Sequence, residues 1–121
     1  MMKILHLITR INRGGTANWL RNLVDLDRES GTETIFAAGR PPSEEIEDEF
    51  FHGMGYLKIP HLNKSISFYQ DLKAFFEIRK ILICVQPEIL NTHTSKAGLI
   101  GRLANASIRD SQTKVIHTFH G

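Results

Sequence analysis

PEILNTHTSKAGLIGRLA (Pro87–Ala104) and KVIHTFHG (Lys114–Gly121) are the two stretches that decide the fold. The first contains a short apolar run, Glu88–Asn91, that predicts a strand, and small residues over Ser95–Arg109 that predict a helix. The second predicts another strand, Val115–Phe119. A strand, a helix and a second strand in this order predict two parallel strands joined by a crossover. Histidines at both strand ends then indicate one rim of a ligand cleft.

Toward the N-terminus, apolar runs of strand length alternate with segments of helical length. The predicted strands are Lys3–Ile8, Glu33–Ala38 and Tyr56–Ile59, and the predicted helices are Thr16–Arg28, Ser43–Gly53 and Phe68–Val85. This alternation predicts an α/β fold, a Rossmann-like, doubly wound parallel sheet in three layers with strand order 3-2-1-4-5. Ligands of such sheets bind beyond the carboxyl ends of the strands where the strand order reverses, here between the first and fourth strands.

Composition supports one Rossmann-like domain over residues 1–121, since 41% of the residues are hydrophobic and 23% are charged. A domain of this length buries roughly 65% of its unfolded surface, which allows a real core. The net charge of +2 gives no argument for nucleic-acid binding. The single cysteine, Cys84, lies in the apolar run KILICV and predicts a buried, inert thiol in a reducing cytoplasm. With no predicted secretory signal or spanning helix, a cytoplasmic protein is expected.

The first candidate site is the loop after the first strand, which contains Arg13, Gly14 and Gly15. Glycines let the backbone approach a ligand, and the following helix N-terminus offers N–H groups that favour phosphates or hydroxyls. The loop matches neither the GxGxxG dinucleotide fingerprint nor the Walker phosphate loop. A simple tight turn between strand and helix explains the glycines equally well.

The second candidate site follows the fourth strand and contains His93, Thr94 and Lys96. Thr94 or Ser95 can cap the next helix, whereas Lys96 puts a cation in the first turn, where cations are unfavourable. That charge points to an anionic partner, and the simpler alternative is a solvated side chain. His93 alone suits a hydrogen-bonded strand-end histidine, so its candidacy rests on where the strand ends.

The third candidate is His120, which precedes Gly121 after the fifth strand. A neutral imidazole at this edge can bind hydroxyl groups and accept a proton near pH 7. A surface histidine without a role is the alternative.

Three strings together resemble the N-terminal, acceptor-side lobe of GT-B fold retaining glycosyltransferases, specifically glycosyltransferase family 4 (glycosyl transferase group 1). They are MKILHLITRINRGG (Met2–Gly15), THTSKAGLIGRLA (Thr92–Ala104) and the ending Thr118–Gly121, and the likeness is weakest over Arg40–Ser67. The resemblance implies that the chain is an incomplete N-terminal lobe of a two-lobed enzyme. Such enzymes move a hexosyl group from a nucleotide-sugar donor to a glycan or lipid-linked acceptor in polysaccharide biosynthesis.

The resemblance also implies roles for the candidate residues. In that family the glycines that match Gly14 and Gly15 line the cleft, and the histidine that matches His120 reaches the transferred sugar, which makes His120 the candidate catalytic residue. The remaining candidates, which would meet acceptor or phosphate, are Arg13, His93, Thr94 and Lys96. Ala17 and Asn18 depart from the family, because many members carry an acidic residue there.

What the family places elsewhere sets further expectations. The nucleotide is held mainly by a C-terminal lobe, so this chain alone is expected to be inactive and to need that lobe as a partner. The chemistry requires no metal or other cofactor. A lipid-linked acceptor is compatible with peripheral association at the inner face of a membrane, and no nucleic-acid partner is expected.

Two hypotheses of other classes follow from the same residues. A stand-alone flavodoxin-like module would bind a small phosphorylated ligand at the reversal point with these 121 residues alone. The receiver-domain version is disfavoured because no acidic pair follows the first strand. Half of an NAD-dependent oxidoreductase is disfavoured by the missing fingerprint, and because Gly39–Pro42 stands where a ribose-binding acid would follow the second strand.

Overall fold

The computed structural model describes residues 2–10, 22, 29–39, 57–63 and 67–118. Within this part of the chain the structure has two helices and five strands. In chain order they are β1 (Lys3–Arg10), β2 (Glu33–Gly39), β3 (Leu57–Lys58), α3 (Phe68–Val85), β4 (Ile89–Thr92), α4 (Ser95–Ala106) and β5 (Lys114–His117). The predicted alternation of strand and helix is seen from β3 to β5.

The strands form one parallel sheet in the order β3-β2-β1-β4-β5, which confirms the predicted topology. β1 lies at the centre, and its Leu5 pairs with Ile35 of β2 and with Leu90 of β4. The order reverses between β1 and β4. We call the side where the strands end the carboxyl edge, and the side where they begin the amino edge.

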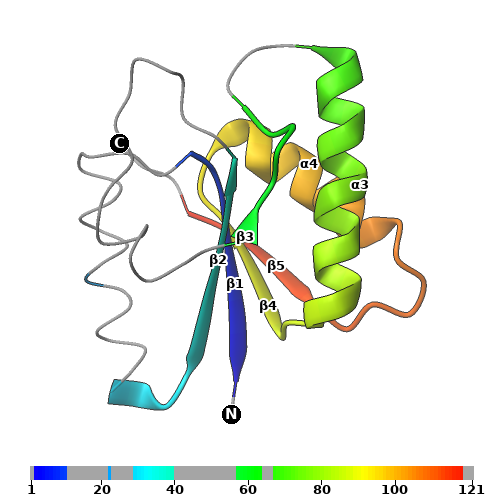
Figure 1. The fold of residues 1–121 in the computed structure, drawn as a ribbon. Helices are drawn as coiled ribbons and strands as arrows, with labels where there is room; N and C mark the ends of the chain where they lie inside the picture. Colours follow the sequence, from blue (N-terminus) through cyan, green and yellow to red (C-terminus); the bar gives the residue numbers. More distant parts are fainter. Residues whose placement is uncertain (1, 11–21, 23–28, 40–56, 64–66, 119–121) are drawn as a thin grey trace.

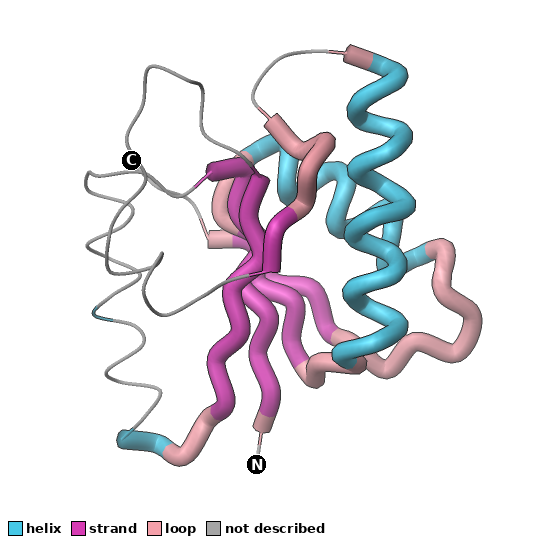
Figure 2. Tube along the Cα trace, in the orientation of Figure 1, coloured by secondary structure: helices cyan, strands magenta, loops and turns pink. Residues whose placement is uncertain are grey.

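Both helices pack on the same face of the sheet (Figures 1 and 2). Side chains alternate between faces along a strand, so Leu5 and Leu7 of β1 point toward the helices and His6 points to the other face. The buried core on the helical side joins both leucines to Leu90 and to one line of side chains on each helix, namely Ala74, Ile78 and Leu82 of α3 and Ala97, Ile100 and Ala104 of α4.

Helix α4 lies close to the sheet at two residues that have no side chain, Gly98 and Gly101. A Cβ atom at Gly101 would lie 2.9 Å from Cδ2 of Leu7, and a Cβ atom at Gly98 would lie 2.9 Å from Nδ1 of His117. The prediction that the small residues of this helix serve close packing is confirmed.

The ends of the two helices show what the sequence predicts well and what it does not. α3 has the predicted bounds: Ser67 is its N-cap, and its hydroxyl accepts a bond from the Gln70 N–H at 3.4 Å. α4 ends at Ala106 and not at the predicted Arg109. The Ser107 hydroxyl donates to the carbonyl of Ala104 at 2.7 Å, and the chain then turns away.

The prediction of a buried Cys84 thiol is wrong, because Cys84 is exposed. The buried line of α3 ends at Leu82, and a residue two positions later lies about 200° around the helix. Leu72 and Phe76 of the same helix are 45% and 58% exposed. The outer surface of α3 therefore carries apolar side chains.

The two helices predicted at Thr16–Arg28 and Ser43–Gly53 lie outside the described residues, apart from Asn22. Glu29 and Ser30 are helical, so helical structure extends two residues beyond the predicted end at Arg28, and Gly31 follows with φ 78°. No helix in the described ranges is both long enough and apolar enough to cross a membrane.

Candidate functional site

Thr94 lies at the carboxyl edge where the strand order reverses. It is the N-cap residue of α4, and its carbonyl accepts the first helical bond from Gly98 N–H at 2.7 Å. Its side chain does not cap the helix. Instead the Thr94 hydroxyl lies 2.5 Å from the hydroxyl of Thr9 and accepts a bond from the Thr9 N–H at 3.3 Å. Thr94 therefore joins the end of β1 to the start of α4.

His93 is the last residue before that cap, and it is 3% exposed. Its N–H donates to the carbonyl of Leu7 at 3.0 Å, which extends the pairing of β4 with β1. Its ring atom Nε2 lies 2.9 Å from Nδ1 of His6, which is 1% exposed. Sequence reasoning missed His6, although a polar residue inside the apolar run KILHLI was a usable signal.

Lys96 points away from this cluster, toward α3. Its Nζ atom lies 2.6 Å from Oδ1 of Asp71 and donates to the carbonyl of Asn63 at 2.7 Å. Asp71 is in the first turn of α3, so the cation at the start of α4 is matched by an acid of the chain itself. The position of Lys96 thus has an internal explanation and does not by itself call for an anionic ligand.

Polar bonds also connect β4 to the end of β5. The Thr92 hydroxyl lies 2.7 Å from Nδ1 of His117, and the Thr118 hydroxyl donates to Oδ1 of Asn91 at 2.9 Å. Thr92 is fully buried. Buried polar groups are costly unless they are bonded, so this edge of the sheet is built to hold hydroxyls, amides and imidazoles in fixed positions.

The predicted site is therefore described only in part. Arg13, Gly14, Gly15 and His120 lie outside the described residues. His93 and Thr94 come together with His6 and Thr9 at the reversal point, and Lys96 does not join them. Within the described ranges, no group of three His, Cys, Asp or Glu side chains is placed to hold a metal ion.

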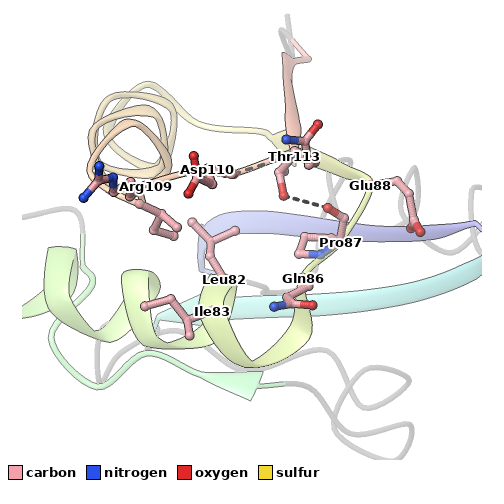
Figure 3. Close-up of a pocket in the computed structure, with 11 residues that line it drawn as sticks. Leu82, Ile83, Gln86, Pro87, Glu88, Arg109, Asp110 and Thr113 are labelled. Carbon is pink, nitrogen blue, oxygen red and sulfur yellow. Dashed lines mark hydrogen bonds between the residues drawn. The ribbon is translucent and has the colours of Figure 1, made fainter.

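The amino edge carries a hollow of about 480 Å³ between the end of α3 and the segment that joins α4 to β5 (Figure 3). The Thr113 hydroxyl donates to the carbonyl of Pro87 at 2.6 Å and links the two walls. The Lys3 N–H donates to the exposed Glu88 carboxylate and lowers the pKa of that group. The hollow is lined by none of the predicted site residues. The hydrogen bonds around it join one segment of the chain to another.

A family profile described as Glycosyltransferase Family 4 matches residues 13–121, which is most of the chain and includes the carboxyl-edge residues of β4, α4 and β5. The chain belongs to glycosyltransferase family 4. The resemblance found in the sequence is thereby confirmed.

One curated relative of this family 4 chain is the UDP-Gal:alpha-D-GlcNAc-diphosphoundecaprenol alpha-1,3-galactosyltransferase of Escherichia coli. The two are 36% identical over 63 residues, a match that covers 52% of the chain and 16% of the relative. The chain thus matches only a small part of the length of that enzyme.

Solved structures share the fold of the family 4 chain at low identity. The UDP-GlcNAc 2-epimerase from Methanocaldococcus jannaschii is 18% identical with a TM-score of 0.64, over 98% of this chain and 31% of the epimerase. MurG from Acinetobacter baumannii is 13% identical with a TM-score of 0.66, over 97% of this chain and 34% of MurG. These likenesses support the predicted Rossmann-like fold of GT-B enzymes.

Proposed function

We propose that the complete protein containing this chain is a retaining hexosyltransferase, which moves a sugar from a nucleotide-sugar donor to a glycan or lipid-linked acceptor. The observation that carries the proposal is the family 4 match over residues 13–121, which includes two of the buried polar residues at the carboxyl edge, Thr92 and His93. The relative from Escherichia coli supports it, because its name gives UDP-galactose as donor and a diphosphoundecaprenol-linked sugar as acceptor.

The chain is proposed to be the acceptor-side lobe, with the donor nucleotide held by a second lobe. Gly14 and Gly15 form the cleft floor in this proposal, and His120 contacts the transferred sugar. The residues proposed to meet the acceptor or a phosphate are Arg13, His93 and Thr94, and Lys96 would join them on leaving its ion pair with Asp71. The hydrogen bonds that fix His93 and Thr94 at the reversal point support the assignment of these two residues.

The test is a transfer assay with the full-length protein, a panel of nucleotide sugars and a polyprenyl-diphosphate-linked saccharide. Product anomers read by NMR should match the donor configuration, and an inverted product would reject the retaining assignment. Gly15→Leu should lower turnover while the protein stays folded, and normal activity would reject the cleft-floor assignment. The 121-residue chain alone should give no product.

We also propose that the complete protein meets the membrane that carries its acceptor, on the cytoplasmic side. The outer surface of α3 supports this proposal, because Tyr69 is 65% exposed and Phe76 is 58% exposed. Lys73 lies 5.1 Å from the centre of the Tyr69 ring. Aromatic and aliphatic side chains mixed with lysines are typical of helices that bind anionic lipid surfaces.

Vesicle sedimentation checks this surface. Phe76→Ser should reduce the bound fraction on vesicles with anionic phospholipid by about fivefold or more, because apolar area drives such binding. Leu99→Ser is the matched control, since Leu99 is 63% exposed but lies on α4. Equal losses in both variants would reject α3 as the contact.

A further inference from the structure

His6 is a buried imidazole for which sequence reasoning gave no role. It lies in the middle of β1, on the sheet face opposite α3 and α4, and is 1% exposed. Its ring stacks on Phe36 of β2, with 5.2 Å between ring centres, and lies 5.1 Å from the ring of His93. An apolar side chain would pack here at lower cost, because burying an imidazole requires partners for its nitrogens.

The contact between the two rings is a hydrogen bond between nitrogens. Nδ1 of His6 and Nε2 of His93 lie 2.9 Å apart, so one of these atoms carries the proton and the other accepts it. A neutral imidazole has one protonated and one unprotonated nitrogen. The proton shared in this bond therefore also determines the role of the outer nitrogen of each ring.

This coupling gives the neutral pair two arrangements. If His6 donates, Nε2 of His93 is the acceptor and Nδ1 of His93 carries a proton. If His93 donates, its Nδ1 atom becomes an acceptor instead. The proton in this bond thereby links a residue inside the sheet to the choice of donor or acceptor that a residue at the carboxyl edge offers.

We propose that His6 is a positioning residue that fixes the ring orientation and the tautomer of His93 for substrate recognition. The inference rests on the proposed function, because it uses His93 as a contact of the acceptor. His6 itself does not reach the substrate in this arrangement. It acts through one hydrogen bond, in the manner of partners that orient a functional imidazole from behind.

Two substitutions separate the hydrogen bond from packing. His6→Leu fills the site but cannot bond to His93, whereas His6→Asn retains a polar atom near the position of Nδ1. Phe36→Leu is the matched control, because it removes the stacked ring beside His6 and leaves both imidazoles in place. Circular dichroism of each variant establishes that the fold is kept.

The experiment is ¹⁵N NMR of the histidine rings in the full-length protein, with the His93 signals assigned by their loss in His93→Gln. His6→Leu should change the Nδ1 and Nε2 shifts of His93 toward a mixture of tautomers, while Phe36→Leu should leave the tautomer unchanged. Unchanged His93 shifts in folded His6→Leu would overturn the proposal, whatever the activity.

Transfer kinetics provide the second readout. His6→Leu should lower kcat/KM by about 10-fold to 100-fold, by analogy with the loss of a partner that orients a metal-binding histidine. His6→Asn should recover most of that loss, and Phe36→Leu should stay near the unaltered protein. Equal losses in His6→Leu and Phe36→Leu would overturn the positioning role in favour of packing. Absence of transfer by the unaltered protein would be a failure of the proposed function, which the NMR result distinguishes.

Discussion

The two edges of the sheet are built from different kinds of contact. Near the carboxyl edge, side chains of β1 bond to side chains of the residues that follow β4, as Thr9 does with Thr94 and His6 with His93. At the amino edge, a hollow of about 480 Å³ is closed by bonds to the backbone, such as that from Thr113 to the Pro87 carbonyl. The edge at which we propose that substrate binds is therefore the one with buried polar side chains, and not the one with the hollow.

The sharpest test of this contrast uses one glycine from each edge. Gly39→Ala at the carboxyl edge should lower the free energy of unfolding by about 3 kcal/mol, because overpacking that moves backbone is costly. Its new Cβ atom would lie 2.5 Å from the carbonyl oxygen of Thr9 and nearer still to that of Leu62. Urea unfolding followed by circular dichroism measures the loss.

The matched control is Gly31→Ala at the amino edge. No atom lies within 4 Å of the Cβ position there, so the cost should come only from the positive φ of 78°. A left-handed backbone costs a non-glycine residue about 1 kcal/mol. Equal losses of unfolding free energy in the two variants would mean that the backbone around Gly39 moves to accept the new methyl group at no extra cost.

Thr92 and Thr113 compare one hydroxyl from each edge. Thr92→Val should cost about 1–2 kcal/mol, because it removes a fully buried hydroxyl that bonds to the His117 ring. Thr113→Val should cost about 0.5–1 kcal/mol, because Thr113 is only partly buried. Denaturant midpoints give both values, provided that the unfolding free energy depends equally steeply on denaturant concentration in each variant. A larger loss of unfolding free energy at Thr113 than at Thr92 would reverse the comparison.

At the carboxyl edge, the ion pair between Lys96 and Asp71 should contribute to the stability of the fold. A double-mutant cycle with Lys96→Met and Asp71→Asn should give a coupling of about 1 kcal/mol, the upper range for partly exposed pairs. Arg109→Met, at the amino edge, should show no coupling to Asp71→Asn. Zero coupling between Lys96 and Asp71 would leave the lysine available for an anionic ligand.

The smallest expected effect is the pH dependence of Glu88 at the amino edge. The Lys3 N–H lowers the pKa of this carboxyl in the folded chain, so folding is favoured by its charged form. Its contribution is present above the pKa of the unfolded chain and is lost as the pH falls through the lower pKa of the folded chain. The difference in stability between Glu88→Gln and the unaltered chain should therefore be larger at pH 6 than in acid below both pKa values. A difference that grows in acid would contradict this assignment.

The sequence predicts the sheet well because local patterns specify it. Apolar runs of strand length are set within a few residues, and the predicted strand order followed from their alternation with segments of helical length. The end of α4 was predicted too late because no glycine or proline stops the helix. The Ser107 hydroxyl ends it instead, through a bond to Ala104 that propensity does not reveal.

The site is harder to predict because its contacts join distant residues. His6 and His93 are 87 positions apart, and their pairing depends on which strands become neighbours. Lys96 was interpreted from its own helix alone, whereas Asp71 on the preceding helix explains its position. Cys84 was assigned to the core because it lies in an apolar run. In the helix it falls on a different side from the buried line of residues, and it is exposed.

The close approach of α4 to the sheet has a consequence for how this family can vary. Gly98 and Gly101 face the sheet because the connection from β4 has a fixed length. Insertion or deletion of one residue there would turn the helix by about 100°. Side chains such as Leu99 or Arg102 would then be directed at the space that the glycines leave. Related sequences should therefore tolerate substitutions in this connection far more readily than changes in its length.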